Sequence, residues 1–209
     1  MIGMMLMYAE SYIFDMDGTL WDSSDGVARA WNEVVEKLPD VNIRFTADNI
    51  KSVMGQTMDV IADKFFGTEN HERNMEIMDL CAAHENEYLL RNGGILYDKL
   101  EETLERLSKH SRLFIVSNCQ AGYIEAFLKH YGFGKYITDH VCWGDNLLSK
   151  GDNIKLIMER NCISDAVYVG DTQGDCDSAY YAGTKFIYAS YGFGTADRYD
   201  MAISQFCEL

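Results

Sequence analysis

Two aspartates near the start of the chain have a spacing that suits catalysis. The segment Asp15-Met16-Asp17-Gly18-Thr19 directly follows the apolar run Tyr12-Ile13-Phe14. In a strand, side chains two residues apart point to the same face, and the glycine and threonine allow a sharp turn where the strand ends. One carboxylate of such a pair can attack an electrophile while the other moves protons or lies beside a metal ion. The alternative is a strand-to-turn junction without catalytic function, because short motifs also arise by chance.

Three further polar segments have a similar place in the chain, after an apolar run or just ahead of a predicted helix. They are Ser117-Asn118, Ser149-Lys150-Gly151, and Gly170-Asp171 with Asp175. In an open parallel sheet the ligand lies beyond the carboxyl ends of the strands, so we expect these segments and the first aspartate pair to meet at one edge. Each segment alone also fits a turn, a solvated lysine or a helix N-terminus. Their order after successive strands favours a shared site.

The expected cluster is rich in carboxylates, which repel one another unless a cation lies between them. Oxygen ligands without a nearby histidine or cysteine favour a hard ion, and Mg²⁺ is the usual ion beside phosphate. Lys150 adds a fixed positive charge, and Ser117 and backbone amides add hydrogen bonds. Together these groups would stabilise the charge that builds on the oxygens of a phosphoryl group.

The elements that must position these residues alternate between strands and helices. Strands are predicted at Ser11–Phe14, Leu113–Val116, Val141–Trp143, Ala166–Val169 and Phe186–Ala189. Between the later strands, apolar residues recur with the period of a helix. This alternation predicts an α/β fold with a Rossmann-like parallel sheet of about five to six strands, flanked by helices.

The interval 22–94 interrupts the alternation, because its apolar residues repeat with helical period and no convincing strand is present. Helices are predicted to begin at Ser23 or Ser24, at Thr46, at Thr57, and at His71 with an end near Leu90. We therefore predict two units. An α/β core comprises residues 1–21 and 95–209, and an inserted all-α cap domain comprises residues 22–94.

Charge and composition limit the possible functions. The 209 residues suffice for a full core with a smaller insertion. A net charge of -15, from 18 Lys and Arg against 33 Asp and Glu, argues against nucleic acid or an anionic membrane as the main partner. The six cysteines lack metal-site spacing, no apolar run reaches membrane-spanning length, and the apolar start at 1–7 lacks the basic segment of a signal peptide. We expect a cytoplasmic protein, a monomer or weak dimer, with reduced thiols.

The chemical segments resemble, in order, the four motifs of the haloacid dehalogenase-like phosphohydrolase superfamily. The matching segments are Asp15–Leu20, Ser117, Lys150, and Gly170-Asp171 with Asp175, and the similarity continues through Trp21–Ser23, Val53–Gly55 and Tyr191–Gly194. The helical interval resembles the small α-helical cap of that superfamily. The chain is most similar to its phosphoglycolate phosphatase and β-phosphoglucomutase-like branch. A departure is Gly151, where relatives usually have proline, and it predicts a looser loop around Lys150.

The resemblance implies a role for each matched residue in catalysis. Asp15 would attack phosphorus and form an aspartyl-phosphate, and Asp17 would protonate the leaving oxygen and then activate water. Ser117, Asn118 and Lys150 would bind the transferring phosphoryl group.

The resemblance also implies a set of ligands for Mg²⁺. They would be the carboxylate of Asp15, the backbone carbonyl of Asp17 and the carboxylate of Asp171. Asp175 would lie close to the ion or reach it through water.

Three functions fit these residues, and we predict the first. It is a Mg²⁺-dependent phosphatase that acts on a small phosphorylated metabolite. The second is a phosphomutase, which must exclude water and hold a second phosphate, for which Arg29, Arg44 and Lys51 are the cap cations available. The third is a non-catalytic module that binds a phosphorylated ligand, because a fold alone does not fix a function. Dehalogenation is disfavoured, since a dehalogenase has no leaving oxygen for Asp17 to protonate.

Overall fold

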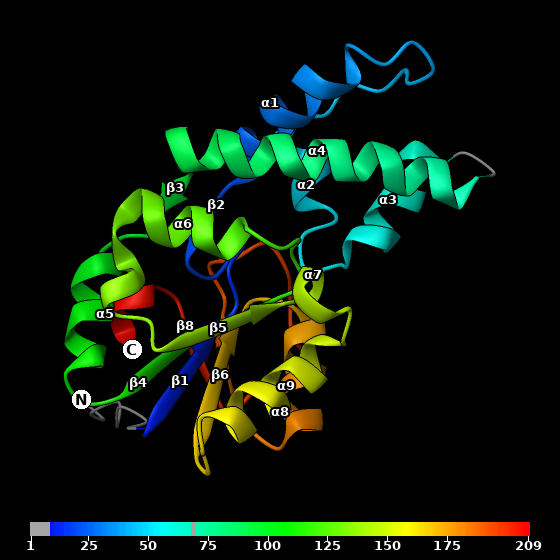
Figure 1. The fold of residues 1–209 in the computed structure, drawn as a ribbon. Coiled ribbons are helices and arrows are strands. Elements are labelled where there is room, and N and C mark those ends of the chain that lie inside the picture. The colour runs from blue at the N-terminus through cyan, green and yellow to red at the C-terminus, as the bar shows by residue number, and fades with distance from the viewer. Residues whose placement is uncertain (1–8, 68–69) are drawn as a thin grey trace.

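A computed structural model describes residues 9–67 and 70–209 of the chain. It shows an α/β core that carries a group of inserted helices on one side (Figure 1). The apolar start at 1–7, on which the expectation of no signal peptide depends, lies outside the described residues.

The core of the described chain is a sheet of six parallel strands in the order β5-β4-β1-β6-β7-β8. The strands are β1 (Ser11–Phe14), β4 (Arg112–Ser117), β5 (Asp139–Cys142), β6 (Ala166–Gly170), β7 (Lys185–Ala189) and β8 (Met201–Ile203). Phe14 pairs in register with Ile115 of β4 and Val169 of β6, so the chain leaves these three central strands at the same edge. The predicted fold class, a Rossmann-like parallel α/β sheet of about five to six strands flanked by helices, is confirmed.

Two strands of the sheet differ from the prediction. β5 ends at Cys142 and not at Trp143, because the short helix α7 (Trp143–Asn146) begins there. β8 was absent from the predicted strands, since its three residues form no long apolar run. It completes the sheet by pairing in parallel with β7.

Helices cover both faces of the sheet (Figure 1), and the apolar side chains of β1 belong in turn to the clusters on the two faces. These helices are α5 (Leu100–Ser108), α6 (Tyr123–Tyr131), α8 (Lys150–Arg160) and α9 (Gln173–Ala182), with short 3₁₀ turns at Phe133–Lys135 and Phe206–Glu208. Tyr12 and Phe14 belong to the apolar cluster that includes residues of α5 and α6. Ile13 belongs to the cluster of α8 and α9. This burial on both faces explains why the strand reads as a continuous apolar run.

The insertion consists of α1 (Ser24–Val35), α2 (Ala47–Lys51), α3 (Met58–Phe66) and α4 (His71–Asn92). α1 and α3 pack against α4, and α4 also packs against α6 of the core. The chain enters and leaves this unit through a small antiparallel ribbon of β2 (Trp21–Asp22) and β3 (Ile95–Leu96). The ribbon corrects the expectation of an interval with no strand, because Asp22 belongs to it. Two crossings of the chain thus connect the insertion to the core.

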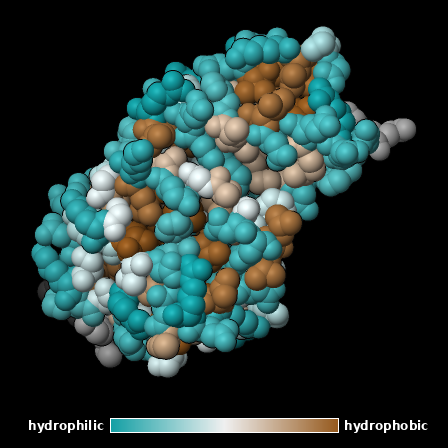
Figure 2. All heavy atoms as spheres, in the orientation of Figure 1, coloured by the Kyte–Doolittle hydropathy of each residue, from teal (hydrophilic) through white to brown (hydrophobic). Residues whose placement is uncertain are grey.

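The surface seen in Figure 2 is mostly hydrophilic, with an apolar patch over the inserted helices. Within the described ranges, none of the helices has the length and apolar character needed to cross a membrane.

Candidate active site

The ends of the three central strands bring together side chains that are far apart in the sequence. Asp15 follows β1, Ser117 ends β4 and Asp171 follows β6. Asp15, Asp17, Ser117 and Asn118 line the core side of a cavity of about 40 Å³. The opposite side of this cavity is formed by residues of the insertion, so the site lies between the two parts of the chain.

Lys150 joins two of the carboxylates in the interior of the protein. Its Nζ donates hydrogen bonds to Oδ1 of Asp15 at 2.8 Å and to Oδ1 of Asp175 at 2.6 Å. The three residues are at most 4% exposed. Burial alone would lower the pKa of Lys150, but the two carboxylates together raise it, so the ammonium keeps its charge.

The pKa of Asp15 is raised, although an ion pair with Lys150 alone would lower it. Burial raises it well above its usual value, the Lys150 ammonium lowers it, and the nearby carboxylates of Asp175 and Asp171 raise it again. One lysine therefore does not neutralise the group. A further positive charge would stabilise the ionised form of Asp15.

Asp171 is held by the closing segment Tyr191–Gly194. The backbone N–H groups of Phe193 and Gly194 donate to its Oδ2 at 2.7 and 3.2 Å. Its Oδ1 is buried and has no hydrogen-bond partner among the described residues. Burial and the carboxylate of Asp175 raise the pKa of Asp171 to about 7, against the effect of the two N–H groups. A buried oxygen of this kind is available to a bound cation or water.

Glycine at position 18 allows the first motif to approach Asp171. Gly18 has a φ of +82°, and a Cβ there would lie 2.3 Å from Oδ2 of Asp171. Both the left-handed conformation and the missing space exclude other residues.

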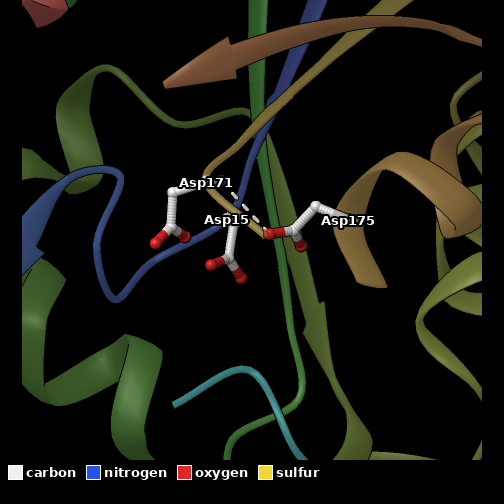
Figure 3. A group of neighbouring side chains, drawn as sticks. All are labelled: Asp15, Asp171 and Asp175. Atoms are coloured by element: carbon white, nitrogen blue, oxygen red, sulfur yellow. Dashed lines mark hydrogen bonds between the residues drawn. The ribbon is translucent and has the colours of Figure 1, made fainter. Parts of the chain in front are cut away.

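The side chains of Asp15, Asp171 and Asp175 converge on one point from β1, the loop after β6 and α9 (Figure 3). Each offers an oxygen, and these oxygens lie within 4.8 Å of one another. Both oxygens of Asp175 are already occupied, Oδ1 by Lys150 and Oδ2 by the backbone N–H groups of Asp171 and Thr172 and the Thr172 hydroxyl. The free oxygens of the cluster thus belong to Asp15 and Asp171. An all-oxygen set with a buried open position fits a hard divalent cation such as Mg²⁺.

Asp17 lies beside this cluster and is oriented by two hydroxyl groups. Ser23 Oγ and Tyr123 OH donate to its Oδ1 at 2.6 and 2.7 Å. Burial raises the pKa of Asp17 to about 6, although both hydrogen bonds lower it. A carboxyl with a pKa near 6 can give and take a proton close to neutral pH.

Sequence reasoning missed the role of both hydroxyl groups. Ser23 stands at the N-cap position of α1, as one of the two predicted candidates, but its side chain makes no capping hydrogen bond. Tyr123 is the first residue of α6, and no motif marks it. The adjacency of Ser23 to the first motif was the available signal.

Asn118 and Gly151 have structural contacts that the motifs do not reveal. Nδ2 of Asn118 donates to the carbonyl oxygen of Gly55 in the insertion at 2.8 Å. Lys150 and Gly151 lie in the first turn of α8 and not in a loose loop. A Cβ at Gly151 would lie 2.5 Å from the ring of Tyr181, so glycine here allows α8 and α9 to pack closely.

The insertion contributes a buried acid to the cavity. Glu85 of α4 accepts hydrogen bonds from Nε1 of Trp31 at Oε2 and from Nε2 of Gln120 at Oε1, the latter at 2.9 Å. Burial raises its pKa to about 8. Sequence reasoning missed Glu85, because it lies among the apolar residues on the inner side of a predicted helix.

Comparison with known proteins decides the family. Residues 12–189 match the family of haloacid dehalogenase-like hydrolases. The chain belongs to this family. The hydrolase is 27% identical over 196 residues to a phosphoglycolate phosphatase of Vibrio parahaemolyticus, and the match covers 86% of this chain and 83% of that protein. The predicted superfamily and its phosphoglycolate phosphatase-like branch are confirmed, as is the class of enzyme, a phosphatase-type hydrolase.

Solved structures share the fold of this hydrolase. A Bacteroides fragilis protein assigned to the haloacid dehalogenase-like hydrolases has a TM-score of 0.83 at 24% identity, with 96% of this chain and 99% of that chain covered. CbbY of Rhodobacter sphaeroides, solved in complex with phosphate, has a TM-score of 0.80 at 19% identity and covers 97% and 96%. At these identities the comparison concerns the fold alone.

Proposed function

We propose that this hydrolase is a Mg²⁺-dependent phosphatase that cleaves a small-molecule phosphate monoester through an aspartyl-phosphate on Asp15. The observation that carries the proposal is the buried contact of Asp15 with Lys150, beside the free oxygen of Asp171 and in the same cavity as Asp17. Relatives named phosphoglycolate phosphatase, which match most of the chain, support a phosphate monoester as substrate.

The proposed reaction has two displacements at phosphorus. One carboxylate oxygen of Asp15 would attack phosphorus, while the other would stay beside Lys150 and the proposed ion. As the bond from Asp15 to phosphorus forms, the ester bond breaks and Asp17 gives its proton to the leaving alcohol oxygen. Asp17 then takes a proton from water, which attacks the phosphorus and releases orthophosphate and free Asp15. Ser117 and Lys150 bind the phosphoryl oxygens between these steps, together with backbone groups near Asn118.

The proposed ligands of Mg²⁺ are the carboxylates of Asp15 and Asp171 and the backbone carbonyl of Asp17. The bound ion would supply positive charge to the phosphoryl oxygens. Asp175 would lie close to the ion or reach it through water, because its oxygens already accept hydrogen bonds from Lys150 and from the backbone N–H of Thr172.

We also propose that residues 22–94 form a cap domain over a core of residues 1–21 and 95–209. The ribbon of β2 and β3 and the position of the cavity between the two parts support these boundaries. A cytoplasmic location and a monomer or weak dimer stay predictions from the sequence.

The phosphomutase alternative is not favoured by the cap cations. Lys51 pairs with Asp22 at 2.7 Å, and Arg29 pairs with Asp25 on the surface of α1. Neither they nor Arg44 line the cavity, so among the described residues of the insertion no cation is placed to hold a second phosphate there. A non-catalytic binding module would need no carboxyl group oriented for proton transfer, as Asp17 is by Ser23 and Tyr123.

The substitution Asp15→Asn tests the proposal. We expect Mg²⁺-dependent release of phosphate from p-nitrophenyl phosphate to fall by at least about a thousand-fold, because an amide is a poor nucleophile. Asp98→Asn, at an exposed position ahead of α5, is the matched control and should keep full activity. Turnover of folded Asp15→Asn at the rate of the control would reject Asp15 as nucleophile, and full activity in the presence of EDTA would reject the need for a metal.

A further inference from the structure

We propose that the substrate is the phosphate ester of a compact, uncharged alcohol with a further hydroxyl group, and that Glu85 selects it by hydrogen bonding to that hydroxyl. This inference rests on the proposed phosphatase function and names the class of substrate for the same site. It departs from the acidic substrate in the name of the related phosphoglycolate phosphatases.

The leaving alcohol has a defined place in the structure. Asp15 and Asp17 lie on the core side of the cavity, and Glu85 and Trp31 lie on the side of the insertion. An ester whose phosphorus faces Asp15 and whose leaving oxygen faces Asp17 must extend its remaining atoms toward the insertion. The cavity of about 40 Å³ favours a compact group here over a bulky one such as p-nitrophenyl.

The charge around this space disfavours an acidic leaving group. Among the described residues that line the cavity there is no lysine, arginine or histidine. Lys150 lies on the core side, where it contacts Asp15 and Asp175 and would bind the phosphoryl group and not the leaving group. A carboxylate on the leaving group would lose its water without gaining a counter-charge, which is unfavourable in a buried site.

Glu85 is the buried carboxyl group that lines the cavity from the insertion, where Gln56 is a further polar residue. Glu85 is 3% exposed, and its two oxygens are fixed by donors from Trp31 and Gln120. Each carboxyl oxygen still has acceptor capacity, and the protonated acid is also a donor. With its pKa raised to about 8 by burial, Glu85 carries a proton at neutral pH and can donate to a substrate oxygen. A hydroxyl group, which both donates and accepts, suits either protonation state.

Apart from Gln56, the remaining side chains of the insertion that line the cavity are apolar, which suits a short carbon chain more than a charged one. They include Val27, Ile50, Val53, Met54, Met58 and Ile61.

Three esters of nearly equal size test this inference on the wild-type enzyme. 2-Hydroxyethyl phosphate, ethyl phosphate and phosphoglycolate differ only in a terminal hydroxymethyl, methyl or carboxylate group. We expect kcat/KM to be highest for 2-hydroxyethyl phosphate and at least ten-fold lower for phosphoglycolate. Equal or higher kcat/KM for phosphoglycolate would overturn the inference and leave the phosphatase proposal intact. Failure to hydrolyse any of the three esters and p-nitrophenyl phosphate would instead reject the phosphatase proposal.

Variants at position 85 test the role of the side chain itself. In Glu85→Leu the advantage of 2-hydroxyethyl phosphate over ethyl phosphate should disappear, whereas Glu85→Gln, which keeps a polar group, should retain it. Because the ratio of the two kcat/KM values is taken within each variant, a general loss of activity does not change it. Glu87→Leu, at an exposed position of the same helix, is the control. An unchanged ratio in Glu85→Leu would contradict selection by Glu85, and if that variant does not fold, the wild-type ranking still decides.

Discussion

Lys150 lies between Asp15 and Asp175 in the interior, and this contact explains how an acidic protein could hold a phosphate ester. The net charge of -15 repels anions at long range, but a buried ammonium acts at short range where water does not screen it. The unpartnered oxygen of Asp171 marks the place where a further positive charge is needed. Lys150, and a cation beside Asp171, would thus offset locally the negative charge that the chain carries as a whole.

Asp17→Asn should lower the rate of phosphate release by at least about a hundred-fold, because an amide neither gives nor takes the transferred proton. Oδ1 of the asparagine can still accept from Ser23 and Tyr123, so we expect the site to keep its shape. Steady-state turnover, with acid-quenched samples to measure phosphorylated enzyme, checks this prediction. Undiminished turnover, with Asp98→Asn as reference, would exclude Asp17 from acid and base catalysis.

Glu85→Gln should make the stability of the protein less dependent on pH. Burial raises the pKa of Glu85 from its usual 4.5 to about 8, so between these values the native state holds a proton that the unfolded chain has lost. Raising the pH through this window therefore destabilises the wild-type protein, by at most about 5 kcal/mol. The glutamine has no such proton.

Urea unfolding at pH 5 and pH 8 measures this difference. The free energy of unfolding of Glu85→Gln should fall less with rising pH than that of the wild type or of Glu87→Gln. Parallel losses in all three proteins would show that Glu85 is already ionised at low pH in the native state.

The residues that were predictable from the sequence are those that directly follow apolar strands. Asp15, Asp17 and Asp171 could be placed near one another because parallel strands end at a common edge. Tyr123 and Glu85 could not, because their contacts with the site depend on how α6 and α4 pack. The spacing of apolar residues along a helix shows which side of the helix is buried, but it does not show which buried side chain reaches a cavity.

Among the elements, the ribbon of β2 and β3 connects the first motif to the insertion. Trp21 of β2 is fully buried, with ring centroids of Tyr123 and Phe127 at 5.5 and 4.9 Å. The ribbon is thereby held against α6. Each strand of the ribbon has only two residues, too few to give a recognisable sequence pattern. The position of the boundary was therefore predictable, but the ribbon that forms it was not.

Trp21→Ala should reduce the free energy of unfolding by about 3–5 kcal/mol, because it removes a buried ring and leaves a cavity between the ribbon and α6. Urea denaturation of the variant measures this loss. The half-buried Trp143 offers a comparison, and Trp143→Ala should cost clearly less. Equal losses in the two variants would mean that the ribbon contributes little to the attachment of the insertion.

For the whole molecule, the alternation of predicted strands and helices was sufficient to predict the fold class. The strand β8 was not predictable from the sequence and became evident only in the structure. This edge strand is only three residues long, and pairing with β7 defines it more than its own sequence does. The site lies where the core and the insertion face each other, so the shape of the cavity depends on both parts.

A crystal structure grown with Mg²⁺ and beryllofluoride, which mimics a phosphoryl group on aspartate, would show whether Asp15 takes up the phosphoryl group beside the ion. We predict the mimic bonded to the carboxylate of Asp15 and in contact with Lys150, with the ion held by Asp15, the backbone carbonyl of Asp17 and Asp171. A mimic bound elsewhere, or an ion that does not touch Asp171, would contradict the account.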